Sequence, residues 1–259
     1  MLSNPEIAII TVTYNCEQDL LRTFESIRSQ KRAIAEYIVV DGGSTDGTLP
    51  LIRMNGDLVH QYVSEPDKGI YDAMNKGIAL TRAPYLLFLN AGDTLYDEDT
   101  LNAIIDELRS SDTDLLYGDV LLAKDNDQWV KRQPRKVGLS YLFVNNLCHQ
   151  TMIFHRRLFE RFGMFDIQEP LLADFKFLLG LTLSGEVTMR HIGRIVCCYP
   201  LTGVSSRTSF AFNYVHRSRV IKSLVSWRSY CAYHIYWLVA KPLTVLQGRW
   251  SRMVKTRIQ

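Results

Sequence analysis

Short apolar runs alternate with amphipathic stretches along the first half of the chain. Runs of about four to eight apolar or β-branched residues predict buried strands, and apolar positions at helical spacing predict helices between them. The predicted strands are Glu6–Thr13, Glu36–Val40, His60–Ser64 and Ala83–Asn90, and the predicted helices are Glu17–Gln30 and Ile70–Leu80. This alternation indicates βαβ units, and therefore an α/β fold with a mostly parallel sheet flanked by helices.

The second half of the chain carries the same patterns less regularly. The predicted strands are Asp114–Leu122, His149–Phe154 and, as a strand or a hairpin, Val187–Tyr199. The predicted helices are Thr100–Leu108, Arg156–Phe162 and Leu171–Ser184, and Lys124–Val137 is a polar excursion without a predicted element. Because the composition changes after Ser206, we predict one domain over residues 1–206 and a helical extension over residues 207–259.

The charges of the chain are distributed unevenly. The formal net charge is +3, but residues 1–186 hold 18 Lys and Arg against 27 Asp and Glu, whereas residues 187–259 hold 12 Lys and Arg and no acid. A basic face of this kind favours an anionic partner, such as a membrane surface or a diphosphate. We do not expect a nucleic acid as the partner, because long apolar runs interrupt the basic residues.

The apolar stretch Tyr230–Leu246 bears on membrane contact. Its 17 residues include His234, Lys241 and the helix breaker Pro242, so it is too short and too interrupted to span a bilayer. It fits an amphipathic helix that lies on an anionic membrane surface, with its aromatic residues at the depth of the headgroups. A helical hairpin packed against the domain is the alternative that the sequence leaves open.

The cysteines and the N-terminus bear on the compartment. The five cysteines are odd in number and form no Cys-x-x-Cys pair, which favours free thiols and argues against a zinc site. They are Cys16, Cys148, Cys197, Cys198 and Cys231. No signal peptide precedes the first predicted strand, so we expect a cytoplasmic protein.

Several predicted strands end in small residues and carboxylates. Asp41, Asp67 and Asp93 each follow such a strand, and open α/β sheets bind ligands at that edge. The glycine-rich loops that bind dinucleotides or nucleoside triphosphates are absent from the sequence. A carboxylate-rich cleft without such a loop would bind phosphate through a hard divalent cation. The residues alone therefore predict a metal-dependent nucleotide enzyme, with Asp93 as a candidate ligand.

Four motifs follow one another along the chain: Thr11–Asn15 (TVTYN), Val39–Thr48 (VVDGGSTDGT), Asp67–Gly77 (DKGIYDAMNKG) and Phe88–Asp93 (FLNAGD). In this order they resemble the family 2 glycosyltransferases of GT-A fold, and among them the bacterial enzymes of capsule, exopolysaccharide and O-antigen assembly, of the colanic-acid type. The resemblance extends over about residues 6–206 and does not include the extension. It implies a GT-A fold and the transfer of a sugar, with inversion, from a nucleotide-diphosphate sugar whose nucleotide is most often UDP in this family.

The resemblance also implies roles for individual residues in the nucleotide pocket. Nucleotide binding falls to Thr11, Thr13, Asn15, Asp41, Asp67, Lys68, Asn90, Ala91 and Gly92. The first three would act largely through their backbone. Asp41 would hydrogen-bond the base or ribose, and Asp67 and Lys68 would close over the nucleotide.

The metal motif departs from the family pattern. Asn90 and Gly92 replace the two acids of the Asp-x-Asp motif, which leaves Asp93 as the one direct carboxylate ligand for Mn²⁺ or Mg²⁺. Oxygens of the diphosphate and of water would complete the coordination shell.

Asp174 occupies the position where the family places its catalytic base. A carboxylate must accept the proton of the acceptor hydroxyl as the new bond forms, and a cation must neutralise the departing diphosphate. Without the resemblance, Asp174 is interpreted as a helix cap. Asp97, Asp119 and Asp166 are interpreted as caps and surface charges. The residues assigned to contact with the acceptor or the diphosphate are His149, Gln150, Ser205 and Arg207.

These observations together predict an inverting, metal-dependent glycosyltransferase. Its acceptor would be a polyprenyl-diphosphate-linked glycan at the inner face of the bacterial plasma membrane, with which the protein would associate peripherally. Two alternatives stay open. A sugar nucleotidyltransferase would normally show a glycine-rich loop after the first strand, and Thr11–Cys16 contains no glycine. A non-catalytic nucleotide- or glycan-binding module is favoured by the reduced metal motif but has no need of Asp174.

Overall fold

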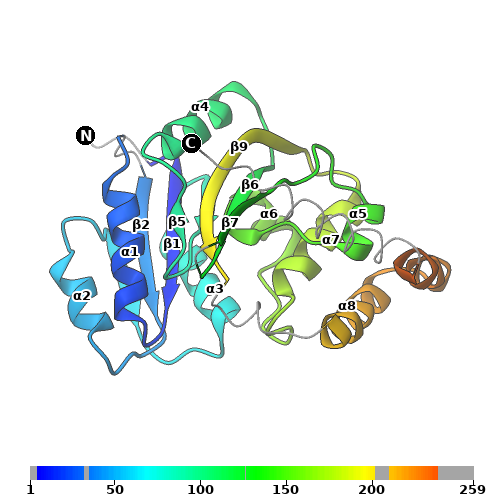
Figure 1. Cartoon of the computed structure of the whole chain (residues 1–259), viewed down its shortest axis with the longest axis horizontal. Coiled ribbons are helices and arrows are strands. Elements are labelled where there is room, and N and C mark those ends of the chain that lie inside the picture. The colour runs from blue at the N-terminus through cyan, green and yellow to red at the C-terminus, as the bar shows by residue number, and fades with distance from the viewer. Residues whose placement is uncertain (1–4, 32–34, 126, 202–209, 239–259) are drawn as a thin grey trace.

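The computed structural model describes residues 5–31, 35–125, 127–201 and 210–238 (Figure 1). In the N-terminal half, strands and helices alternate as the sequence predicts. The elements are β1 (Ile7–Thr13), α1 (Glu17–Arg28), β2 (Ala35–Asp41), α2 (Thr48–Met54), β3 (Gln61–Ser64), α3 (Ile70–Leu80) and β4 (Tyr85–Phe88). The predicted strands and helices of this half are all present, because each combines a clear hydrophobic period with polar or glycine-rich ends.

The second half contains shorter and less regular elements. They are β5 (Thr94–Leu95), α4 (Thr100–Ser110), β6 (Leu115–Lys124), β7 (Asp127–Lys131), α5 (Leu139–Val144), the 3₁₀ turn η1 (His149–Thr151), β8 (Met152–His155), α6 (Arg157–Phe162), α7 (Ala173–Ser184), β9 (Met189–Pro200) and α8 (Phe210–Leu224).

Two sequence predictions for this half are wrong. The supposed excursion Lys124–Val137 contains β7, an antiparallel partner of β6 that carries no buried residue and therefore no apolar run. The predicted strand His149–Phe154 begins as η1, where the Thr151 amide donates to the Cys148 carbonyl at 3.0 Å, and becomes extended only at Met152.

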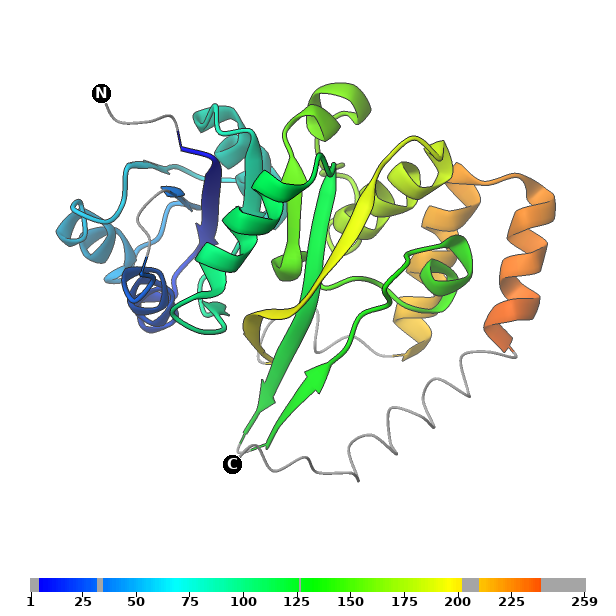
Figure 2. The same ribbon diagram turned by 90° about the horizontal axis from the view of Figure 1, so that it is seen from above.

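The strands form one sheet in the order β3-β2-β1-β4-β8-β6-β9-β5, and β7 pairs with β6 (Figure 2). The first four strands are parallel, with Thr13 of β1 opposite Asp41 of β2. β8 runs antiparallel to both of its neighbours, β4 and β6. The carboxyl ends of β1, β2 and β4 consequently meet at one edge, which is where an open α/β sheet binds ligands.

Helices cover both faces of the sheet, and each face has its own apolar core. Successive residues of β1 point to opposite faces, so Ile9 packs with α1 and α4 whereas Ile10 packs with α3 and α7. The close approach of α3 to β1 requires Gly77, where a Cβ atom would lie 2.4 Å from Ile10 Cγ2. The predicted α/β fold is therefore confirmed, with the sheet buried between two helical layers.

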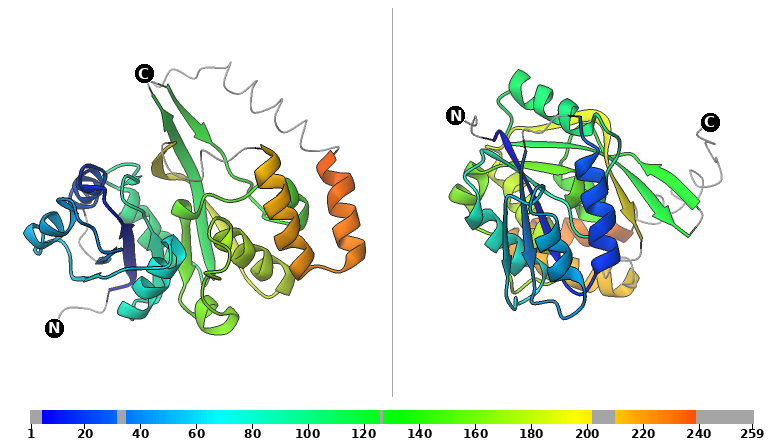
Figure 3. Two further views of the ribbon diagram at one scale, coloured as in Figure 1. Left: turned by 90° about the horizontal axis from the view of Figure 1, so that it is seen from below. Right: turned by 90° about the vertical axis from the view of Figure 1, so that its left-hand side faces the viewer.

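The described part of the C-terminal extension folds back onto the domain. α8 packs beside α7, and a second helix over residues 227–238 lies next to α8 (Figures 2 and 3). Tyr233 of the second helix is fully buried, with its ring centroid 5.5 Å from that of Phe143 in α5. Within the described ranges, we find no helix with the length and hydropathy needed to cross a membrane.

Candidate functional site

A cavity of about 1110 Å³ opens at the carboxyl ends of β1 and β4 and extends to α7 and α8. The residues predicted for the site that line this cavity are Thr13, Asp67, Asn90, Ala91, Gly92, Asp93, His149, Gln150 and Asp174. The fold thus brings five separate segments of the chain to one cavity. Ser205 and Arg207 lie outside the described residues.

Four other predicted residues do not line the cavity. Thr11 is fully buried, and its hydroxyl donates to the Leu89 carbonyl at 2.7 Å. Asp41 is also fully buried, and its carboxylate accepts hydrogen bonds from the amide of Ser44 at 3.1 Å and from the hydroxyl of Ser64 at 2.6 Å. These side chains are used inside the fold, where a buried polar group requires a partner.

Asn15 and Lys68 also lie outside the cavity, because both belong to loops at the edge of the sheet. Asn15 has a positive φ of 48°, and its Oδ1 accepts a hydrogen bond from the amide of Thr45 at 2.8 Å, so it fixes the loop after β2. The Lys68 amide donates to Asp72 Oδ2 at 2.9 Å, and the residue is exposed. Both residues shape the loops at the sheet edge.

The turn Asn90–Asp93 is held against α1 by a single hydroxyl. Thr23 Oγ1 accepts from the Gly92 amide at 2.9 Å and donates to the Asp93 carbonyl at 2.8 Å. Gly92 has a φ of +98°, a conformation that other residues rarely adopt. The departure from the family's acid at this position therefore coincides with a backbone turn that needs glycine.

This turn offers two oxygen atoms to a cation. Asn90 Oδ1 and Asp93 Oδ2 are buried and accept no hydrogen bond from any described residue. Burial raises the pKa of Asp93 to about 7, and the nearby His149 opposes that rise. A hard divalent cation takes carboxylate and amide oxygens, so the donor set fits Mg²⁺ or Mn²⁺. The described residues contain no group of three or more His, Cys, Asp or Glu side chains able to hold a metal, so substrate oxygens would supply further ligands.

His149 connects the turn to the predicted catalytic base. Its Nε2 lies 3.0 Å from Asn90 Nδ2, and its Nδ1 lies 3.5 Å from Asp174 Oδ2. Burial opposes a charge on His149, but the hydrogen bond and negative charge of Asp174 outweigh it and raise the pKa of the imidazole. The two ends of the cavity are therefore electrostatically linked through one side chain.

Asp174 lies in the first turn of α7 and is only 7% exposed. Its Oδ1 accepts short hydrogen bonds from the Tyr71 hydroxyl at 2.8 Å and the Phe175 amide at 2.7 Å, and Oδ2 makes a longer contact with Asn146 Nδ2 at 3.3 Å. Although burial opposes ionisation, His149 and Tyr71 hold the pKa of Asp174 below its usual value. The carboxylate is thus kept ionised, and Oδ2 is the oxygen with the weaker contacts.

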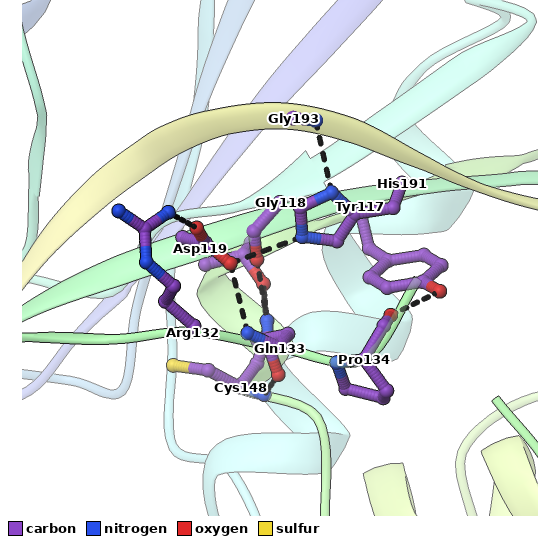
Figure 4. Close-up of polar contacts among 10 residues, drawn as sticks. Tyr117, Gly118, Asp119, Arg132, Gln133, Pro134, Cys148, His191 and Gly193 are labelled. Carbon is purple, nitrogen blue, oxygen red and sulfur yellow. Dashed lines mark hydrogen bonds and ion pairs between the residues drawn. The ribbon is translucent and has the colours of Figure 1, made fainter. Parts of the chain in front are cut away.

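A polar network behind the cavity fixes η1 (Figure 4). Gln133 accepts a hydrogen bond from the Cys148 amide at 3.0 Å and donates to Thr151 Oγ1 at 2.6 Å. Asp119 in turn accepts from the Gln133 amide at 2.8 Å and contacts His191 Nε2 at 3.0 Å. Asp119 is only 3% exposed, so its prediction as a surface charge is wrong.

The far side of the cavity is basic and aromatic. Lys131 of β7, Tyr214 and Arg217 of α8, and Trp237 of the last described helix line it. The sequence predicted no role in the site for these residues, and it placed Trp237 in the stretch expected to contact a membrane. A lone lysine in a polar segment and an arginine in a basic helix carry no signal that distinguishes them from surface charges.

Comparisons with known proteins agree with the fold. Residues 8–166 match the model of the family described as "Glycosyl transferase family 2". A Mycobacterium bovis protein named "PGL/p-HBAD biosynthesis glycosyltransferase" is 33% identical over 221 residues, which cover 80% of this chain and 81% of that protein. Its alignment extends beyond the segment that the family model covers.

Two solved structures share the fold. S. aureus TarS in complex with UDP superposes with a TM-score of 0.65 at 17% identity, over 85% of this chain and 70% of that chain. The Pyrobaculum calidifontis mannosyltransferase PcManGT, in complex with GDP-Man and Mn²⁺, has a TM-score of 0.61 at 19% identity, over 96% of this chain and 74% of that chain. With the family match over most of the sheet and the close relative over four fifths of the sequence, this chain belongs to glycosyl transferase family 2.

Proposed function

We propose that the protein is an inverting transferase that moves a sugar from a nucleotide-diphosphate sugar to a lipid-linked or growing surface-polysaccharide acceptor. One observation carries this proposal. The Asp174 carboxylate lines the same cavity as the Asn90–Asp93 turn, and His149 connects the two. Inverting transfer needs a base on one side of the sugar and a stabilised leaving group on the other, and these two groups satisfy that requirement.

In the proposed reaction, Asp174 accepts the proton of the acceptor hydroxyl. Tyr71 and the Phe175 amide orient Oδ1, so Oδ2 receives the proton after its longer contacts with Asn146 and His149 give way. The leaving diphosphate would lie at Asn90–Asp93. Mn²⁺ or Mg²⁺, when bound there, supplies positive charge that stabilises the departing diphosphate.

The donor and the metal are supported by structural relatives. TarS is described with UDP and PcManGT with GDP-Man and Mn²⁺. We propose a UDP-sugar as donor, with Asp93 and Asn90 as the protein ligands of the cation. A non-catalytic binding module would not require the ionised, hydrogen-bonded Asp174.

The acceptor and the location are supported by the outer surface of the extension. Trp227 is 74% exposed, and Ile235 and Leu238 are each 67% exposed on the helix over residues 227–238. The sequence from Val187 onward carries only basic charges. Exposed aromatic and aliphatic residues among basic ones suit the surface of an anionic membrane. We propose a peripheral position on the inner face of the plasma membrane and a polyprenyl-diphosphate-linked acceptor.

Release of nucleotide from a panel of UDP-, GDP- and dTDP-sugars tests the proposal, with Mn²⁺, with Mg²⁺ and with EDTA. The wild type should hydrolyse one donor slowly in the presence of metal, and Asp93→Ala should lose that activity. Asp174→Asn should still bind the donor but fail to transfer sugar to membrane-extracted lipid-linked saccharides. Turnover of no donor, even with those saccharides present, would contradict the proposal.

A further inference from the structure

Two cations that line the cavity, Lys131 and Arg217, form no ion pair with a described residue. Lys131 Nζ donates to the Asn146 carbonyl at 3.3 Å, and Arg217 Nη1 donates to the carbonyls of Leu142 and Asn145, each at 2.8 Å. All 27 Asp and Glu residues lie in the ranges that the structure describes, and within those ranges neither cation forms an ion pair. Hydrogen bonds to carbonyl groups alone do not fully compensate a buried positive charge for its lost hydration.

The surroundings of both cations disfavour their charge. Burial lowers the pKa of Lys131, and Arg217 acts in the same direction against the opposing effect of the Cys148 thiol. Burial also lowers the pKa of Arg217 to about 10. Arg217 disfavours the charge of Lys131, and the negative charge of Asp174 only partly offsets the effect of burial on Arg217. An anionic ligand would therefore complete the electrostatics of this part of the cavity wall.

The pair lies next to the proposed base. Asn146, whose carbonyl accepts from Lys131, donates through its side chain to Asp174 at 3.3 Å. The Arg217 guanidinium lies 4.1 Å from the ring centroid of Phe175, the residue that follows Asp174. Each cation thus contacts a residue that hydrogen-bonds or directly follows Asp174, the carboxylate that would accept the proton of the acceptor hydroxyl. The acids Asp19, Asp67 and Asp93 also line the cavity.

We propose that Lys131 and Arg217 form a subsite for a phosphate group of the acceptor, close to its reacting sugar. This inference rests on the proposed function and names the part of the acceptor that the cavity recognises. A lipid-linked diphosphate separated from the reacting hydroxyl by one sugar ring would place its charge on this side of Asp174. The aromatic wall formed by Tyr214 and Trp237, whose ring centroids are 4.2 Å apart, lies on the same side and would contact the lipid or the sugar.

Calorimetric titration with geranyl diphosphate, in EDTA and without nucleotide, tests the subsite on the full chain. Lys131→Met should weaken binding roughly tenfold or more, since a hydrogen bond to a charged group contributes on that scale. Lys131→Arg retains the charge and should bind as the wild type does. Arg217→Gln retains donors for the two α5 carbonyls and should also bind weakly, while circular dichroism reports whether the variant is folded.

Two comparison ligands separate the possible sources of phosphate. UDP with Mg²⁺ should bind Lys131→Met within about twofold of the wild type, whereas a large loss would assign the cations to the donor diphosphate and overturn the proposal. Geraniol should bind far more weakly than geranyl diphosphate, and equal binding would also overturn it. A protein that turns over no nucleotide sugar but binds geranyl diphosphate through Lys131 would contradict the proposed function and leave the subsite intact. Normal donor turnover with no binding of geranyl diphosphate would reject the subsite alone.

Discussion

Replacement of Asp93 by asparagine should stabilise the metal-free protein at high pH. Burial raises the pKa of this carboxyl from 3.8 to about 7 in the folded state. Below pH 3.8 both folded and unfolded states hold the proton, and Asp93 has no pH-dependent effect on stability. As the pH rises from 3.8 to about 7, the unfolded state releases its proton first and stability falls. Above that range, the free-energy cost of burying the ionised carboxylate no longer changes with pH.

The magnitude follows from the shift in pKa. A difference of about 3 pKa units corresponds to about 4 kcal/mol against the ionised form. The introduced amide would leave a buried N–H group without a partner, which costs about 1–3 kcal/mol at every pH. The net gain for Asp93→Asn above pH 8 is therefore about 1–3 kcal/mol, and the pH-dependent part is the full difference of about 4 kcal/mol.

Urea denaturation of wild type and Asp93→Asn at pH 4.5 and pH 8.5, in EDTA, measures this difference. The stability of the variant relative to the wild type should rise by about 3–4 kcal/mol between the two pH values. Asp112→Asn serves as the control, because that side chain is 82% exposed and its surface ion pair contributes little. A relative stability that is the same at both pH values would refute the reasoning that burial raises the pKa of Asp93.

Three further predictions follow from particular contacts. Tyr71→Phe removes a hydrogen bond to ionised Asp174, so the pKa of the carboxyl should rise and the acid limb of the pH profile of kcat/KM should move to higher pH; an unmoved limb would argue against Asp174 as the base. Gly77→Ala should cost about 1–3 kcal/mol in thermal denaturation, whereas Gly180→Ala, where a Cβ meets nothing within 4 Å, should gain up to about 1 kcal/mol. Trp227→Ser should weaken sedimentation with anionic vesicles without lowering the melting temperature, because this side chain is 74% exposed; unchanged sedimentation would contradict membrane contact through this face.

The N-terminal half could be predicted from sequence because its signals are local. Strands β1, β2 and β4 are runs whose burial on both faces shows directly as apolar composition, and polar or glycine-containing turns mark their ends. The second half was harder to predict because β7 carries no buried residue, and η1 owes its form to Gln133, a residue outside the turn. Hydrogen bonds between residues that are distant in the sequence produce no periodic pattern of apolar residues.

The candidate site likewise contains residues that local motifs identify and residues that only the tertiary structure brings together. The residues placed by ordered motifs, such as Asn90 and Asp93, line the cavity, as does Asp174. Thr11 belongs to an equally clear motif, yet its hydroxyl is used inside the fold. A motif identifies residues that matter to the local structure but does not separate those that touch a ligand from those that support them. Lys131 and Arg217 follow from neither motif nor periodicity, because only the fold brings them to the same cavity as Asp174.

The described part of the extension acts as a wall of the site. Arg217 donates to two carbonyls at the end of α5 and stacks on Phe175, and Tyr233 is buried against Phe143. Removal of the extension would therefore leave α5 carbonyls without donors and would expose part of the apolar core. Loss of membrane binding in a chain truncated before α8 would consequently be ambiguous, because the domain itself would be disturbed. Substitutions on the exposed face, such as Trp227→Ser, change the membrane-facing surface while the cavity wall stays in place, so they are the variants that can separate membrane contact from catalysis.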